Sequence, residues 1–75
     1  MKLPERIVIQ SDVMMGKPCI RGTRIPVYLL LQKLAAGETA AEILRAYPQL
    51  TAADVQACLA YASMLASEEV VLTGT

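Results

Sequence analysis

Hydrophobic and polar residues follow different patterns along the chain, and these patterns predict a short β region followed by helices. In residues 6–10 (RIVIQ) β-branched side chains cluster, as is typical of a strand. Residues 18–20 and 24–26 flank Arg21-Gly22-Thr23 and have the pattern of two hairpin arms, with Gly22 supplying the positive φ of the turn. Prolines at the outer ends of the arms would confine both strands to sheet edges.

A nearly continuous apolar segment, residues 27–36 (VYLLLQKLAA), predicts the first helix. Pro26 suits its first turn, and Gly37 is a typical terminator. Only Gln32 and Lys33 are strongly polar, so the helix is apolar on almost every side. A small domain has little chain with which to cover such a helix, so we expect it to contact a second subunit or another protein. The candidate contacts on this helix are Tyr28, Leu29 and Leu31.

Two cap signals predict the second and third helices. The sequence TAAE at residues 39–42 has the spacing of a capping box, and Pro48 stops the helix that follows. The sequence TAAD at residues 51–54 repeats this spacing, and the third helix is then expected to run to Ser67. The predicted apolar face of the third helix consists of Val55, Cys58, Leu59, Ala62 and Leu65.

Together these elements predict a mainly α fold in a single domain, residues 1–75. A strand and a basic β-hairpin (residues 1–26) precede a three-helix bundle of the helix-turn-helix type (residues 27–67), and residues 68–75 form a tail. The tail contains a second set of candidate partner contacts, Val70, Val71 and Leu72. This segment has three alternatives: to add a strand to a partner's sheet edge, to fold back on its own core, or to fray.

The composition favours association. The chain has 75 residues, of which 55% are hydrophobic, and a mean hydropathy of +0.43. This is more apolar surface than a lone domain of that size easily buries. We therefore expect a homodimer or a complex with another protein.

Membrane, metal and enzymatic functions have little support in the sequence. No segment approaches the ~20 apolar residues of a membrane span, and no signal-peptide core is present, so we expect a cytoplasmic protein. Cys19 and Cys58 lie 39 positions apart and the chain has no histidine, which excludes the usual zinc spacings and a histidine general base. We expect no cofactor, no metal and no catalytic residues, and both cysteines are predicted to be buried thiols.

Charge is unevenly distributed, although the chain is neutral overall. Residues 1–33 hold six cations and two acids, a net charge of +4, whereas residues 34–75 hold one cation and five acids, a net charge of −4. Lys17, Arg21 and Arg24 concentrate positive charge in the hairpin, which leaves a local surface for anions. The order of glycine and lysine there does not match a phosphate-binding P-loop.

Two functions remain open from the residues alone, DNA binding and protein contact. Two capped helices joined at residues 47–50 have the arrangement that presents a recognition helix to a major groove. The third helix, however, has no Lys or Arg for phosphates or base edges, and Gln56 is its candidate polar contact. DNA binding would therefore require the hairpin cations or two copies of the chain.

Four consecutive motifs resemble the domain-of-unknown-function family 433 over residues 6–66. They are G-K-P-x-I-x-G-T-R-I-P-V (16–27), L-A-A-G (34–37), E-I-L-x-x-Y-P-x-L-T (42–51) and L-A-Y-A (59–62). The resemblance implies a homeodomain-like three-helix fold behind a β-hairpin, association as dimers, and an antitoxin role beside a small PIN-like nuclease. It provides no catalytic residues. Including its motif positions, the candidate nucleic-acid contacts are Lys17, Arg21, Thr23, Arg24 and Gln56.

We therefore expect a cytoplasmic, dimeric, antitoxin-like protein without enzymatic activity. It would neutralise a PIN-like nuclease by protein contact and bind operator DNA to repress its own operon. The alternative is a protein-interaction or dimerisation module that does not bind DNA.

Overall fold

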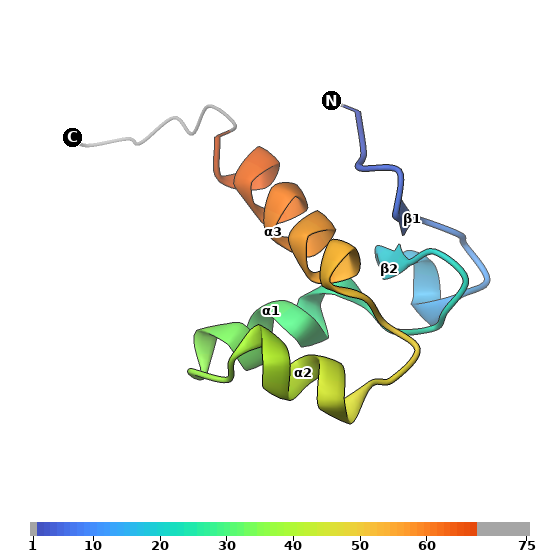
Figure 1. The fold of residues 1–75 in the computed structure, drawn as a ribbon. Helices are drawn as coiled ribbons and strands as arrows, with labels where there is room; N and C mark the ends of the chain where they lie inside the picture. The colour runs from blue at the N-terminus through green and yellow to red at the C-terminus, as the bar shows by residue number, and fades with distance from the viewer. Residues whose placement is uncertain (1, 68–75) are drawn as a thin grey trace.

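The computed structural model describes residues 2–67 of the chain (Figure 1). Within these residues the fold is mainly helical, with three α-helices behind a short two-stranded antiparallel sheet, as the sequence predicts. The elements in chain order are β1 (Ile7–Val8), a short 3-10 turn η1 (Met14–Gly16), β2 (Cys19–Ile20), α1 (Val27–Ala35), α2 (Ala40–Ala46) and α3 (Ala52–Ala66). In Figure 1, α3 packs across α1 and α2, and β1 lies beside its first turns.

The β region is shorter than predicted, and β2 is its central segment. β1 pairs with β2 in an antiparallel register that places Val8 opposite Cys19. The pairing stops early because the chain turns at Gln10, whose carbonyl accepts a hydrogen bond from the amide of Val13 at 3.0 Å. On its other side β2 meets the second hairpin arm through one bridge, between Cys19 and Pro26. The predicted hairpin is therefore present, with the N-terminal strand added to its first arm.

Both ends of α1 are completed by backbone hydrogen bonds from outside the helix. The carbonyl of Pro18, in the hairpin, accepts the amide of Val27 at 2.9 Å and so satisfies one of the free donors at the helix start. At the other end Gly37 has φ +98°. The amide of Gly37 donates a hydrogen bond to the carbonyl of Leu34 at 3.0 Å, and the amide of Glu38 donates one to the carbonyl of Lys33 at 3.0 Å. This pair of bonds is a Schellman motif, which ends the helix where the sequence predicts.

The acidic residues of both predicted capping boxes accept backbone hydrogen bonds. Glu42 Oε1 accepts the amide of Thr39 at 3.0 Å, and Thr39 Oγ1 accepts the amide of Glu42 at 3.1 Å. At the start of α3, Asp54 Oδ2 accepts the amide of Thr51 at 2.8 Å. The other oxygen of Asp54 accepts from Arg6 Nη1 at 3.2 Å. A residue that caps α3 therefore also joins it to the N-terminal segment beside β1.

The core lies where α1, α2, α3 and the β region meet. Its buried residues come from every one of these elements: Ile7, Ile20, Val27, Leu30, Ile43, Leu50, Val55, Ala57 and Cys58. Both cysteines are buried free thiols, as predicted.

The predicted apolar face of α3 is only partly buried. Val55 and Cys58 are in the core, but Leu59 is 42% exposed and Leu65 is 46% exposed. Leu59 is rotated by about 100° from Cys58 around the helix, which turns it toward solvent. Leu65 follows Cys58 by seven residues and so lies on nearly the same face, but in the last turn, beyond the core. The prediction names this apolar face but not how far the core covers it, and these two leucines remain exposed for two different reasons.

Candidate functional site

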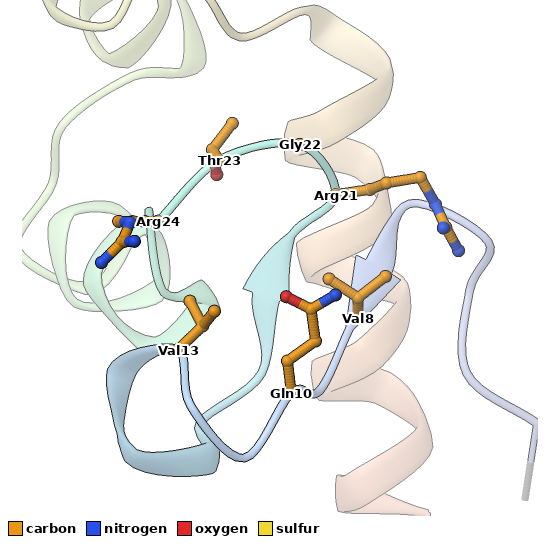
Figure 2. Close-up of a pocket in the computed structure, with 7 residues that line it drawn as sticks. All are labelled: Val8, Gln10, Val13, Arg21, Gly22, Thr23 and Arg24. Atoms are coloured by element: carbon orange, nitrogen blue, oxygen red, sulfur yellow. The ribbon is translucent and has the colours of Figure 1, made fainter.

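The motif at residues 16–27 forms one wall of an open hollow next to the sheet (Figure 2). The hollow has a volume of about 410 Å³ and is lined by Val8, Gln10, Val13, Arg21, Gly22, Thr23 and Arg24. Three of the five predicted nucleic-acid contacts therefore lie together, at the tip of the hairpin. Gly22 has φ +78°, as the turn requires, and the other residues of the tip are arranged around it.

Thr23 is a structural residue of this tip. Its hydroxyl donates to the carbonyl of Ile20 at 2.8 Å and accepts from the amide of Ile25 at 3.0 Å. Its own amide also donates to the Ile20 carbonyl, at 3.0 Å. The hydroxyl thus joins the two hairpin arms, which share only one β-bridge. Because the hydroxyl is already engaged in these hydrogen bonds, they compete with the predicted contact to nucleic acid.

Arg21 and Arg24 are both exposed, but they diverge. Figure 2 shows their side chains leaving opposite sides of the hollow, so the two guanidinium groups do not converge on one point. Arg21 Nε donates to the carbonyl of Glu5 at 2.8 Å, which holds this side chain along the N-terminal segment. Two separated cations suit two phosphates of an extended backbone better than one small anion.

Lys17 lies away from the other hairpin cations. Its Nζ is 5.6 Å from the ring centroid of Tyr28 on α1, within the range of a cation–π contact. A left-handed turn that the sequence does not predict leads into Lys17. Met14 and Met15 have φ of 50° and 57°, and Gly16 has φ of 80°. The structure thus moves one predicted nucleic-acid contact to a surface that contains a predicted partner contact.

That second surface is an apolar groove between α1 and α3, which we call the α1–α3 groove. It has a volume of about 220 Å³ and is lined by Lys17, Pro18, Val27, Tyr28, Leu31, Tyr61 and Leu65. Tyr28 and Leu31, two of the predicted partner contacts, both line it, whereas Leu29 does not. Val70, Val71 and Leu72 lie outside the described residues. Sequence reasoning did not identify Pro18 and Tyr61 as contact residues, and it placed Leu65 on the apolar face of the third helix without assigning it to a groove.

The surface of α3, all of which is described, carries no charged side chain. Its exposed residues are Ala52, Ala53, Gln56, Leu59, Ala60, Ser63, Leu65 and Ala66. Its one charged residue, Asp54, is only 6% exposed and is paired with Arg6. Gln56 is exposed, as expected, but it lines neither the hollow nor the groove. Guanine and phosphate contacts usually come from Arg or Lys, so α3 lacks the common means of reading DNA.

Both cysteines are buried and free, and Cys58 is a weak acid. Burial, and secondarily the negative charge of Asp54, raise the pKa of Cys58 to about 11, so this thiol is protonated at neutral pH. Among the described residues no cluster of three His, Cys, Asp or Glu side chains is suited to hold a metal ion. Nor does any helix in this part of the chain have the length and apolar character needed to cross a membrane.

Comparison with known proteins identifies the family. The family model described as protein of unknown function (DUF433) matches residues 7–62, which include the sheet, the hairpin and most of α3. The chain belongs to the DUF433 family. A crystal structure of a DUF433 member from Anabaena variabilis is similar to it, with a TM-score of 0.76 and 39% sequence identity over 79% of this chain and 58% of that one.

Two curated relatives are also similar, each over part of its own length. The uncharacterized protein y4eO of Sinorhizobium fredii is 36% identical over 58 residues, which are 77% of this chain and 26% of that protein. An uncharacterized protein of Archaeoglobus fulgidus is 70% identical over 23 residues, 31% of this chain and 64% of that protein. The chain thus spans about a quarter of the length of y4eO.

Proposed function

We propose that this DUF433 chain is a cytoplasmic, antitoxin-like protein without enzymatic activity. It neutralises a PIN-like nuclease by protein contact and binds operator DNA as a homodimer. The observation that carries the proposal is the separation of two chemically different surfaces on one small fold. Arg21 and Arg24 extend from the hairpin tip, whereas the α1–α3 groove is apolar and has one cation, Lys17, among its lining residues.

The groove is the surface that we assign to the nuclease. Tyr28 is 44% exposed and Leu65 is 46% exposed, and such large apolar side chains at the mouth of a groove are typical anchors of protein interfaces. Tyr61 and Leu31 form part of the lining and are half-buried, so the anchors stand on an ordered surface.

The first experiment is capture of the tagged chain from its own host, with identification of the bound proteins by mass spectrometry. A small nuclease with an acidic active site, recovered in stoichiometric amount, supports the proposal. Leu65→Ser should then reduce its recovery several-fold, whereas Leu59→Ser is the matched control. Leu59 has similar exposure, 42%, on the same helix but does not line the groove. Recovery of the chain with only itself would exclude the nuclease partner.

The hairpin tip is the surface that we assign to DNA. Each phosphate contact that is lost should reduce the slope of log K against log salt by about 0.9. The Arg21→Ala/Arg24→Ala variant should therefore reduce it by about 2 if both residues contact phosphates, and adding Lys17→Ala would test a third contact. Arg45→Ala, an exposed cation on α2, is the control. An unchanged slope in the double variant would exclude both arginines as phosphate contacts.

The uncharged surface of α3 favours a second candidate, a protein-interaction or dimerisation module that does not bind DNA. Fragments of the chain's own promoter region distinguish the two candidates. Binding that exceeds binding to a scrambled fragment at physiological salt supports the DNA role. If the chain, alone and with its partner, binds both fragments equally weakly, the second candidate holds. Sedimentation equilibrium tests the homodimer in the same samples.

A further inference from the structure

The hollow at the hairpin tip contains an uncharged polar side chain that takes no part in the hydrogen bonds of the hairpin. This side chain belongs to Gln10, which follows β1 and lines the hollow. Gln10 is exposed, and within residues 2–67 its amide group makes no hydrogen bond to another part of the chain. The hydroxyl of Thr23, in contrast, is engaged both as donor and as acceptor. Gln10 therefore has a donor and an acceptor that are free to bind a ligand.

The backbone on either side of Gln10 is held in place. Val8, two residues earlier, is paired with Cys19 in the sheet, and the carbonyl of Gln10 accepts the amide of Val13 at 3.0 Å. Residues two apart on an extended chain lie on one face, and both Val8 and Gln10 line the hollow. Figure 2 shows the amide of Gln10 pointing into the hollow, with the side chains of Val8 and Val13 on either side of it. The amide is thus presented between two apolar side chains.

A glutamine amide presents a donor and an acceptor side by side, which matches the major-groove edge of adenine. There adenine offers an acceptor, N7, beside a donor, the N6 amino group, so a glutamine can bind both at once. Guanine offers two acceptors and satisfies only the donor of the amide. The thymine that pairs with adenine adds a methyl group, which suits apolar neighbours such as Val8 and Val13. The centre of the hollow therefore fits an A·T base pair.

The two arginines lie where phosphates are expected around such a contact. Arg21 and Arg24 leave opposite sides of the hollow into which Gln10 points. A major groove about 12 Å wide admits a two-stranded β-ribbon and has a phosphate backbone on each side. Phosphate contacts position a protein on DNA, whereas contacts to base edges select the sequence. The hollow offers groups for both kinds of contact, whereas the surface of α3 offers no cation for a phosphate or a guanine.

We propose that Gln10 reads one A·T base pair in the major groove of DNA. Its Nε2 donates to N7 of adenine and its Oε1 accepts from the N6 amino group, while Val8 and Val13 contact the methyl group of the paired thymine. This inference rests on the DNA role proposed for the hairpin tip. It adds to that role the residue that selects the sequence, and it assigns base reading to the hairpin side of the fold, not to α3.

A selection experiment with the full chain tests this assignment. Duplexes that bind the chain are recovered from a pool in which about one helical turn of sequence is randomised, and the affinity for a selected duplex is measured by fluorescence anisotropy. We expect the selected duplexes to share an A·T pair, and its replacement by G·C should lower the affinity of the parent chain about tenfold. Gln10→Ala should bind both duplexes equally, with an unchanged slope of log K against log salt, because the lost side chain is uncharged.

Two further variants complete the comparison. Gln10→Glu keeps the shape of the side chain but has no amide donor, so it should also lose the preference for the A·T pair. Gln32→Ala is the matched control, because Gln32 is an exposed glutamine on α1 that lines neither the hollow nor the α1–α3 groove. This control should keep the preference of the parent chain.

The outcomes separate the role of Gln10 from the DNA role on which it rests. If the parent binds duplexes with a salt slope that Arg21→Ala/Arg24→Ala reduces, but without a base preference, the DNA role stands and the assignment of Gln10 is overturned. A preference that persists in Gln10→Ala would also overturn it, and loss of that preference in Gln56→Ala would assign base reading to α3. If the parent binds no duplex of the pool at physiological salt, the DNA role and the role of Gln10 both fail.

Discussion

In the turn at the tip of the hairpin, Gly22 supplies the backbone conformation and Thr23 supplies the hydrogen bonds. Gly22 has φ +78°, and a Cβ added there would have no atom of the described chain within 4 Å beyond its neighbours. Thr23 holds both arms through one hydroxyl, at 2.8 Å and 3.0 Å. The motif is therefore first a folding unit, and its arginines project from a turn that its other residues build.

Gly22→Ala should lower the free energy of unfolding by about 1 kcal/mol. The cost comes from the left-handed backbone alone, because the new methyl group meets no steric obstacle. Gly22→Asn should cost less, since asparagine tolerates this conformation better. Urea unfolding monitored by circular dichroism measures both variants. Equal stability of Gly22→Ala and the parent chain would contradict the assigned conformation.

Cys58 should make stability depend on pH in the alkaline range. Its pKa is raised from 9.0 to about 11 in the folded chain, so the folded state holds the proton more tightly than the unfolded state. The contribution of this proton to stability is therefore complete below pH 9.0 and is lost as the pH rises toward 11.

The Cys58→Ala variant removes that contribution. Its overall stability should be lower because a buried side chain becomes smaller, but its loss of stability between pH 9 and pH 10.5 should be less steep than that of the parent. Urea unfolding at several pH values in reducing buffer measures the difference. Parallel pH profiles would show that the folded chain does not protect the thiol.

At the scale of elements, each helix boundary is determined by a few backbone hydrogen bonds. The Schellman motif at Gly37 ends α1, and the box formed by Thr39 and Glu42 starts α2 two residues later. An ion pair between Lys33 and Glu38, at 3.5 Å, spans the same connection. Because these interactions are local, the end of α1 and the start of α2 can be predicted from neighbouring residues.

Glu42 should give the start of α2 a dependence on acidic pH. The hydrogen bond from the backbone of Thr39, followed by the one from its hydroxyl, lowers the pKa of Glu42 below its usual value of 4.5. The contribution of the carboxylate is therefore present above pH 4.5 and is lost as the pH falls through the lowered pKa.

Glu42→Gln keeps the side-chain length but removes the titrating group. Compared with the parent, this variant should lose less stability between pH 6 and pH 3, as measured by thermal unfolding. Asp12→Asn controls for an exposed acid outside the box. If Glu42→Gln and the parent respond equally to acid, the capping carboxylate does not contribute in solution.

At the scale of the whole molecule, the motif at residues 16–27 contributes to both the hairpin tip and the α1–α3 groove. Arg21 and Arg24 extend from the motif at the hollow, whereas Lys17 contacts Tyr28 at the groove. The pair formed by Arg6 and Asp54 joins the N-terminal segment to α3, so both surfaces stand on one connected framework.

We expect the two surfaces to be separable by mutation. Leu65→Ser should weaken nuclease capture and leave the salt dependence of DNA binding unchanged. Arg21→Ala with Arg24→Ala should reduce the salt dependence of DNA binding and leave nuclease capture unchanged.

Thr23→Val should lower the free energy of unfolding by about 1 kcal/mol, because it removes hydrogen bonds within the turn, and it should leave the salt dependence of DNA binding unchanged. A variant of one surface that abolishes both activities while remaining folded would show that they form one site.

The sequence by itself determined the features that depend on neighbouring residues. Helix ends follow from Gly37 and from the spacing of Thr39 and Glu42, and the turn follows from Gly22, because backbone conformation and capping act within a few residues. The family also followed from four short motifs along the chain, and it was confirmed by the match over residues 7–62.

Only the tertiary structure decided which side chains share a surface. Charge counting places Lys17 with Arg21 and Arg24, but folding directs it to Tyr28. Helical periodicity places Leu65 on the apolar face of the third helix, but the core ends before the last turn of α3, so Leu65 lines a groove. The physical reason is that contacts between distant segments depend on the packing of whole elements, which no local pattern of residues specifies.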